Sequence, residues 1–528
     1  MSDRPSWLNE IRNPGMYPHA VTQIQLIETH ISWVILTGDW AYKLKKPVNF
    51  GFVDFSTLEL RRLACLEEIR LNRRTAPRLY DGVVLLAAEP DGPRFDGEGL
   101  ALEYAVRMRE FAQEDLLEHC LERHELSMSF IHELARAVAA LHHQAAVATP
   151  DSEYGDPVLI RDNVLSCLSP LQFPTDRSLL ASQRNDCQIW VHSEWNRLFE
   201  HFAARRKQGW VRECHGDLHL GNLVRIEGRP VLFDCLEFNP TLRWIDVISD
   251  LAFLLMDLFH LAQDSMAWQV LNEWLEQTGD FEGLHVLKFY LIYRALVRAK
   301  VAALRAGQAE ITAPEAERLQ GLLANYLRLA QKMTRSFSPA IIVMHGLSGS
   351  GKTFLAKQLA ASLPAIQIRS DVERKRMLGS EVAGRDSPDQ DRNRLYTMEA
   401  TRRTYLRLNE LAETVLTAGY PVIMDAAFLR QADRTEVMAM ANRCSVPCLI
   451  VSCHAPESVL RQRVVQRQKQ GADASDADAN VLTAQLNRAE PLTLAEREVT
   501  VEFDTTSDQC SDLLQTLLAR LGTTLTPA

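Results

Sequence analysis

The first third of the chain alternates short apolar runs with turn residues. Residues 24–47 are β-branched and aromatic runs broken at residues 37–39, a pattern that predicts a hairpin of strands. Residues 83–88 and 101–108 predict two further strands, and residues 57–74 predict a helix before them. This region therefore predicts a small sheet accompanied by a helix.

Helical spacing dominates the middle of the chain. The apolar residues of 127–141 recur at the spacing of an amphipathic helix, and long helical patterns run from residue 244 to about residue 333. Strands first and helices later indicate an α+β domain in which a sheet lobe precedes a helical lobe.

A new pattern begins after residues 334–339, which contain Ser and Pro and predict a linker. The apolar run IIVMHG leads into a Gly/Ser-rich turn and then into the helix-forming segment TFLAKQLAASL. Such a strand–loop–helix unit opens a domain of alternating β and α elements, for which we expect a parallel sheet. We predict one domain over residues 1–333 and an α/β domain over residues 340–528.

Composition narrows the class of protein. The chain of 528 residues is 46% hydrophobic and 24% charged, as is usual for soluble globular proteins. Its net charge of −10 argues against a broad grip on nucleic acid or an anionic membrane, so we expect neither as a partner. The first residues lack the apolar core of a signal peptide, and Asp257 interrupts the apolar run at 251–259, so we expect a cytoplasmic protein.

The segment HGDLHLGN carries the first candidate site. Asn222 follows Asp217 by five residues, and Asp234 follows Asn222 by twelve. Phosphoryl transfer needs a carboxylate that orients the attacking hydroxyl and oxygen ligands that hold Mg²⁺ on the nucleotide phosphates. Asp217 fits the first role, and Asn222 and Asp234 fit the second.

This segment resembles the catalytic loop of the aminoglycoside phosphotransferase and choline-kinase-like family, in which a Gly stands inside the His-x-Asp motif. The resemblance covers roughly residues 20–330. It implies a protein-kinase-like bilobal fold, an ATP cleft, and transfer of the γ-phosphoryl group to a hydroxyl of a small molecule. It also implies that Asp250, rather than Asp246, braces the catalytic loop.

A lysine that reaches the α- and β-phosphates is expected upstream of the loop. Lys43 and Lys45 lie on one face of the predicted strand, because side chains alternate with period two, and either could serve. We predict Lys43. Its partner would come from the following helix, where Glu67 and Glu68 are both available, and the family resemblance favours Glu68.

The chain departs from the protein-kinase pattern before the lysine strand, because ETHISWVILTGD contains a single Gly. Ser32 and the backbone of residues 30–32 could supply N–H groups to the phosphates instead. His215 and His219 flank Asp217, and we expect them to pack the loop rather than to bind a metal.

The segment GLSGSGKT matches the full GxxxxGK[ST] pattern and lies between a strand candidate and a helix candidate. In such a loop, backbone N–H groups curl around phosphates at a helix N-terminus. Lys352 would reach the β- and γ-phosphates, and the Thr353 hydroxyl would bind Mg²⁺. The nucleotide-binding residues predicted in the loop are Gly346, Ser348, Gly349, Ser350, Gly351, Lys352 and Thr353.

The segment of roughly residues 340–520, which includes this loop, resembles small-molecule P-loop kinases of the gluconate kinase, shikimate kinase and zeta-toxin type. The resemblance implies that Asp371, at the end of the next strand, is the base for the acceptor hydroxyl. Arg374 and Lys375 are candidates for gripping a polar or anionic acceptor. Asp425 ends a buried strand and could hold the Mg²⁺ shell through water.

Arg463 and Arg467 lie one helical turn apart and precede the biased segment GADASDADAN at 471–480. The pattern resembles the arginine-bearing lid of nucleotide and sugar kinases, and a solvated helix face is the alternative.

ATP and Mg²⁺ are the cofactors that both motif sets imply. The leading hypothesis is a bifunctional kinase that acts on hydroxyls of sugars, polyols or aminoglycoside-like molecules. A second hypothesis makes one domain a nucleotide-binding regulator of the other. A non-catalytic scaffold and an antibiotic-resistance enzyme stay open, although complete sets of magnesium-binding residues favour catalysis over a scaffold.

Overall fold

The computed structural model describes residues 4–51, 53–173, 178–307, 311–382, 397–470, 478–506 and 510–521. The chain forms two compact units. The first unit comprises Met1–Asn163 with Phe199–Asp257, and the second comprises Val164–Leu198 with Leu258–Ala528. The helices after residue 258 thus belong to the same unit as the GLSGSGKT loop. The domain boundary predicted at residues 334–339 stays a prediction.

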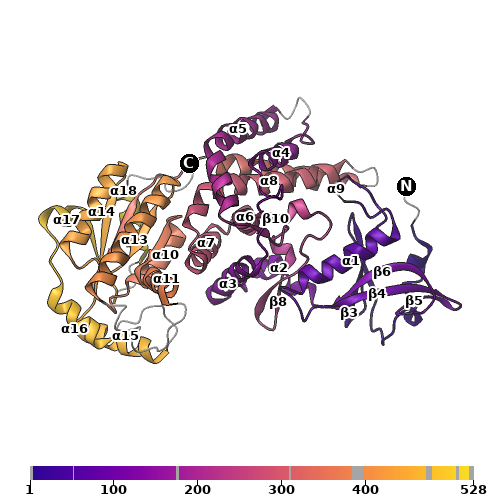
Figure 1. Cartoon of the computed structure of the whole chain (residues 1–528), viewed down its shortest axis with the longest axis horizontal. Helices are drawn as coiled ribbons and strands as arrows, with labels where there is room; N and C mark the ends of the chain where they lie inside the picture. The colour runs from indigo at the N-terminus through magenta and orange to yellow at the C-terminus, as the bar shows by residue number, and fades with distance from the viewer. Residues whose placement is uncertain are drawn as a thin grey trace. The chain divides into compact units, whose positions relative to one another are not determined.

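An antiparallel sheet of order β1-β2-β3-β6-β4-β5 forms the start of the first unit (Figure 1). Its strands are β1 (Gln25–Glu28), β2 (Ser32–Leu36), β3 (Trp40–Lys45), β4 (Tyr80–Glu89), β5 (Gly92–Phe95) and β6 (Leu100–Arg109). Helix α1 (Leu58–Asn72) begins at Thr57, whose side chain accepts a hydrogen bond from the Leu60 amide. The predicted strands and helix are therefore confirmed.

The two faces of this sheet have separate cores. Tyr42 and Leu44 of β3 pack with Phe95 on one face, and Ala41 packs with Cys65 of α1 on the other. Because side chains alternate along a strand, Lys43 and Lys45 share the face that α1 covers.

The remainder of the first unit is built around the HGDLHLGN segment. Its further elements are α2 (Leu117–Glu122), α3 (Met128–Gln144), β7 (Val211–Glu213), β8 (Leu223–Ile226), β9 (Arg229–Leu232), β10 (Trp244–Asp246) and α6 (Val247–His260). Strand β10 pairs with β7, and β8 pairs with β9 as a hairpin. The segment from His215 to Asn222 connects β7 to this hairpin.

Helices make up the part of the second unit that precedes the P-loop. They are α7 (Asp264–Thr278), α8 (Leu284–Ala306) and α9 (Ala313–Met333), and they confirm the helical pattern predicted up to residue 333. Two earlier helices, α4 (Pro157–Leu168) and α5 (Ser178–Lys207), lie in a stretch for which the sequence pattern gave no prediction.

A parallel sheet of order β12-β13-β11-β14-β15 forms the rest of the second unit. Its strands are β11 (Ile341–His345), β12 (Ile366–Arg369), β13 (Val422–Asp425), β14 (Cys448–His454) and β15 (Thr500–Asp504). The surrounding helices are α10 (Lys352–Ser362), α11 (Ser370–Val382), α13 (Met398–Thr417), α14 (Gln431–Cys444), α15 (Glu457–Gln470), α16 (Ala479–Arg488), α17 (Leu494–Glu498) and α18 (Cys510–Leu521). The predicted α/β fold with a parallel sheet is confirmed.

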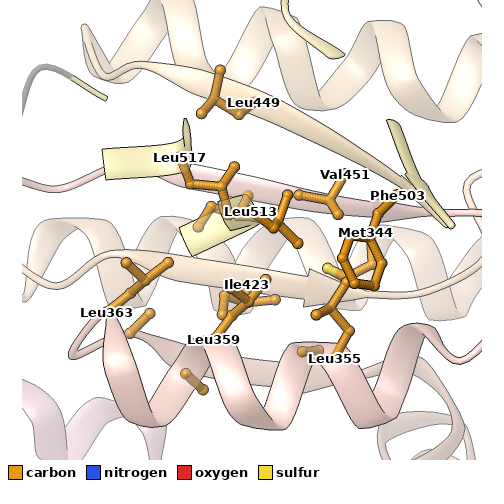
Figure 2. Close-up of a cluster of buried hydrophobic side chains, with 14 of the residues drawn as sticks. Met344, Leu355, Leu359, Leu363, Ile423, Leu449, Val451, Phe503, Leu513 and Leu517 are labelled. Atoms are coloured by element: carbon orange, nitrogen blue, oxygen red, sulfur yellow. The ribbon is translucent and has the colours of Figure 1, made fainter. Parts of the chain in front are cut away.

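The core of this sheet explains why its strands read as continuous apolar runs. Figure 2 shows Met344, Ile423 and Val451 packed against leucines of α10 and α18. Strands covered on both faces bury nearly every side chain, and β11 to β13 do so over most of their length. Within the described residues, no helix combines the length and the apolar character needed to cross a membrane.

Candidate active sites

Asp250 fixes the start of the HGDLHLGN segment. Its carboxylate accepts hydrogen bonds from the amides of His215 and Gly216, at 3.0 and 2.9 Å, and lies 3.1 Å from Nε2 of His142. Burial alone would raise the pKa of Asp250, but the contact with His142 and the bonded amides lower it to about 2. This geometry agrees with the bracing role that the family resemblance implies.

Gly216 meets a requirement of the same loop. Its φ is +86°, and a Cβ there would lie 3.1 Å from Cβ of Arg243, from Cβ of Leu236 and from the Leu242 carbonyl oxygen. Any other residue would be strained both in its backbone and in its packing. The Gly inside the His-x-Asp motif therefore has a physical cause.

Asp217 and Asn222 are in direct contact. The Asn222 Nδ2 group donates to Oδ2 of Asp217 at 3.0 Å and to its carbonyl oxygen at 2.9 Å. Asp217 remains 39% exposed, so a substrate can reach its carboxylate. His219 lies 3.4 Å from that carboxylate and packs against Phe253, whereas His215 is buried with Nε2 2.9 Å from the Phe233 carbonyl oxygen.

The β8–β9 hairpin places Asp234 close to Asn222. Leu223 pairs with Leu232, and the Phe233 amide donates to the Asn222 carbonyl oxygen at 3.1 Å. Asp234 follows directly, with φ of +60° and an amide that donates to the Tyr80 hydroxyl at 3.1 Å. The oxygen-bearing side chains predicted to hold Mg²⁺ therefore come from the two ends of one hairpin, and their chemistry fits that ion.

Lys43 connects the sheet to its expected partner Glu68 and also to Asp234. Its ammonium group lies 3.0 Å from Glu68 and also contacts Asp234. Burial favours the neutral amine, but the two carboxylates outweigh it and hold the pKa of Lys43 well above its usual range. Lys43, Glu68 and Asp234 meet in one cluster, of which the sequence predicted the pairing of Lys43 with Glu68.

Lys45 has a different environment, which decides between the two lysines. Its side chain is fully buried and pairs with Glu68 and with Glu237. Lys43 is 13% exposed and lies beside Asp234, so its ammonium group is the more accessible of the two. Glu67 pairs instead with Arg70 and Arg243, at 2.7 and 2.6 Å. Sequence reasoning missed Glu237, which stands only three residues after Asp234.

The turn before β2 does not offer the Ser32 amide to phosphates, as the sequence suggested it could. Ser32 is 1% exposed, and its amide donates to Oγ1 of Thr29 at 3.0 Å. That N–H group already has a partner inside the turn, which argues against the predicted contact with phosphates.

In the second unit, the glycine loop runs from Gly346 to Gly351 between β11 and α10. Gly346 has φ of +136°, and a Cβ there would lie 2.3 Å from the Cys453 carbonyl oxygen. The loop ends at the N-terminus of α10, which begins at Lys352. Amides at a helix N-terminus bind anions, so this conformation suits phosphates.

Thr353 and Asp425 form the candidate cation site beside this loop. The Thr353 hydroxyl donates to Oδ1 of Asp425 at 3.3 Å, and Nε2 of Gln367 donates to Oδ2 at 2.9 Å. Burial raises the pKa of Asp425 and lowers the pKa of Lys352. A hydroxyl and a buried carboxylate at a phosphate-binding loop fit Mg²⁺.

A cavity of about 440 Å³ brings the predicted residues of the second site together. Asp371 and Arg374 line it, 3.7 Å apart, whereas Lys375 is exposed and does not line it. Of the residues predicted for this site, the lining includes Ser348, Gly349, Gly351, Lys352, Thr353, Asp371, Arg374, Asp425, Arg463 and Arg467.

The predicted lid arginines both face this cavity. Arg463 donates to the Gly349 carbonyl oxygen at 3.3 Å and to Oγ1 of Thr505 at 2.9 Å. Helix α16 also contributes, because Gln485 accepts a hydrogen bond of 2.8 Å from the Ser348 amide. Most of the predicted lid segment, residues 471–477, lies outside the described residues.

Sequence reasoning missed several residues of the cavity lining. They are Arg369, Thr401, Tyr405, Arg430, Asp433 and Arg488. The position of Arg369 at the end of β12, two residues before Asp371, was a signal that could have found it.

Three comparisons with known proteins found similar proteins and structures. A family model described as an AAA domain matches residues 341–492, which include every residue predicted for the second site. An uncharacterized protein of Mycobacterium tuberculosis (strain ATCC 25618 / H37Rv) is 28% identical over 469 residues, covering 88% of this chain and 91% of that protein.

Two solved kinase structures are each similar to part of the chain. The amicoumacin kinase hAmiN, in complex with AMP-PNP, Ca²⁺ and Ami, is 13% identical, with a TM-score of 0.39, and covers 62% of this chain and 94% of its own. A gluconokinase from Sinorhizobium meliloti 1021 is 22% identical, with a TM-score of 0.25, and covers 36% of this chain and 94% of its own.

Proposed function

We propose that this protein is a cytoplasmic ATP-dependent phosphotransferase with two nucleotide sites, each of which transfers the γ-phosphoryl group of ATP to a hydroxyl of a small molecule. The cavity of the second unit carries the proposal. It combines a phosphate-binding loop, the Thr353–Asp425 pair and the carboxylate of Asp371. A protein that only binds nucleotide needs the phosphate-binding loop alone, whereas phosphoryl transfer also needs a carboxylate that faces the acceptor hydroxyl.

At the second site, Lys352 and the loop amides bind the phosphates. Thr353 would hold Mg²⁺ directly, and Asp425 would hold it through water; bound Mg²⁺ neutralises charge on the phosphates. Asp371 accepts the proton of the attacking hydroxyl, and Arg374 orients the acceptor.

The charge of this cavity favours an anionic acceptor. Positive residues among its lining are Lys352, Arg369, Arg374, Arg430, Arg463, Arg467 and Arg488, against Asp371, Asp425 and Asp433. Nucleotide phosphates with Mg²⁺ would balance part of this excess, and a carboxylate or phosphate group on the acceptor would balance more of it. A polyol or sugar that bears such a group fits best.

At the first site, Asp217 takes the role of base for the acceptor hydroxyl. Asn222 and Asp234 would hold Mg²⁺, and Lys43 would bind the phosphates while Glu68 keeps it in place. The exposed carboxylate of Asp217, next to a buried Asn222, supports this assignment.

The test is ADP release by the full chain, measured against neutral polyols, sugar acids, sugar phosphates and aminoglycosides. Asp217→Asn and Lys352→Ala are compared with the matched controls Asp91→Asn and Lys332→Ala, which change exposed residues of the same type. We expect one acceptor-dependent signal to fall at least about 100-fold with Asp217→Asn and a different one with Lys352→Ala.

Two other outcomes would contradict the proposal of two catalytic sites. If Lys352→Ala weakened only the response to acceptors of the first site, the P-loop domain would be a nucleotide-binding regulator. If neither substitution changed ADP release with any acceptor, the proposed function would be wrong.

A further inference from the structure

One face of helix α7 lies against the edge of the parallel sheet, inside the second unit. Trp268, Asn272 and Glu276 recur every four residues and therefore lie on one side of the helix. Each of them contacts residues between Phe337 and Tyr420. Helix α7 also packs on α10, the helix that begins at the glycine loop (Figure 1).

Asn272 fixes the register between this helix and the edge strand β12. The Gln367 amide donates to Oδ1 of Asn272 at 2.7 Å, and Nδ2 of Asn272 donates to the Ala365 carbonyl oxygen at 3.0 Å. One side chain thus satisfies both backbone groups that this part of the strand edge presents, as a neighbouring strand would. The contact holds the backbone of β12 to the helix.

Trp268 extends the contact toward the linker predicted at residues 334–339. Its ring lies 5.5 Å from that of Phe337 and 6.0 Å from that of Tyr420, both at steep angles. Such edge-on aromatic pairs add to the burial of apolar surface. Helix α7 is therefore held by Trp268 as well as by Asn272.

Glu276 carries the contact into the candidate active site. Its Oε1 accepts a hydrogen bond of 2.8 Å from Nη1 of Arg369, and the two side chains are 19% and 7% exposed. On its other side, Nε of Arg369 lies 4.0 Å from Oδ2 of Asp425. Arg369 lines the cavity, so a single guanidinium separates the helix from the carboxylate of the candidate Mg²⁺ site.

We propose that Glu276 is a positioning residue of the P-loop site, which keeps the Arg369 guanidinium from competing with Mg²⁺ for Asp425. This inference rests on the proposed function of that site. A buried guanidinium seeks a carboxylate partner, and the carboxylate of Asp425 lies within reach of Arg369 as well as that of Glu276. With Glu276 present, the Arg369 guanidinium is held at the Glu276 carboxylate, and the Asp425 carboxylate stays available to Mg²⁺.

The consequence concerns domain organisation. Glu276 lies outside the matched family segment at 341–492 and outside the predicted domain at 340–528. The P-loop site is then complete only with a helix that precedes it in sequence, and any change in α7 reaches the Mg²⁺ site through one side chain.

The experiment uses the full chain with Asp217→Asn, which silences the first site, and follows ATP hydrolysis with water as the acceptor. For Glu276→Gln, the Mg²⁺ concentration is measured both for the half-maximal hydrolysis rate and for half-maximal binding of a non-hydrolysable ATP analogue, counting only the binding that Lys352→Ala abolishes. We expect about a tenfold increase for this variant, and no change for the exposed control Glu282→Gln. Glu276→Asp, which keeps the charge, should restore most of the Mg²⁺ response.

A double substitution separates positioning from a structural role. If Glu276 acts through Arg369, Glu276→Gln should have no further effect on the Mg²⁺ constant once Arg369→Gln is present. An unchanged Mg²⁺ constant in Glu276→Gln, with hydrolysis still abolished by Lys352→Ala, would overturn the inference alone. If some Glu276→Gln protein fails to fold, the constant of the folded fraction still decides, because it does not depend on enzyme concentration. Hydrolysis that Lys352→Ala leaves intact would instead refute the proposed function.

Discussion

The ammonium group of Lys43 lies 3.0 Å from Oε1 of Glu68, so strand β3 and helix α1 share an ion pair beside Asp234. The chain separates Lys43 from Asp234 by 191 residues. This pair is the point at which the sheet meets the segment that bears the candidate Mg²⁺ ligands.

Lys43→Met should abolish the activity of the first site. Because the variant lacks the positive charge that would face the nucleotide phosphates, we expect the Asp217-dependent rate to fall about 100-fold or more. ADP release is measured in a Lys352→Ala background, so that only the first site contributes. Lys46→Met is the control, because the neighbouring Lys46 pairs with Glu28 away from this cluster; an equal loss in both variants would contradict the assignment of Lys43.

Lys45→Met should lower the stability of the protein more than Lys43→Met does. Removal of this buried cation leaves Glu237 as a buried carboxylate without the partner it now has, which should lower the free energy of unfolding by about 3–5 kcal/mol. Urea unfolding measures the change. Arg62→Met breaks the solvent-exposed pair with Glu59 and should change the free energy of unfolding far less. Comparable losses in the two variants would show that burial does not set the difference.

Asp250→Asn should weaken the first unit in a way that depends on pH. The pKa of Asp250 is lowered to about 2, so its ionised form stabilises the fold above its ordinary pKa and this gain is lost as pH falls from about 4 to about 2. The gain is roughly 2 kcal/mol. The wild-type advantage over Asp250→Asn in unfolding experiments should therefore shrink across that window, and a constant advantage would rule out this cause.

His345→Asn should change the pH response of the second unit over a higher range. Burial lowers the pKa of His345 to about 4, so the folded state holds it neutral while the unfolded chain binds a proton below about 6.5. Stability should then fall as pH decreases from about 6.5 to 4, by roughly 3 kcal/mol. His345→Asn should flatten this slope, and the exposed control His454→Asn should keep it. Parallel slopes for all three proteins would disprove the prediction.

Local chemistry was readable from the chain where its residues are contiguous. The glycine loop from Gly346 to Thr353 needs a strand before it and a helix after it, and the apolar run and helix-forming segment around it supply both. The same holds for the loop from His215 to Asn222. Hydrophobic periodicity also predicted the sheet, helix α1 and the long helices up to residue 333, because period two and period 3.6 need no distant partner to be recognised.

Tertiary structure alone decided the choices between equivalent neighbours. Lys43 and Lys45 lie on the same face of one strand, and only the approach of Asp234 and Glu237 gives them different partners. Glu276 carries no motif, and it becomes important because helix α7 lies against β12 and meets Arg369. Sequence fixes what each side chain can bond to. Which partner it meets depends on segments that are far apart along the chain and come together only when apolar faces pack and buried charges need partners.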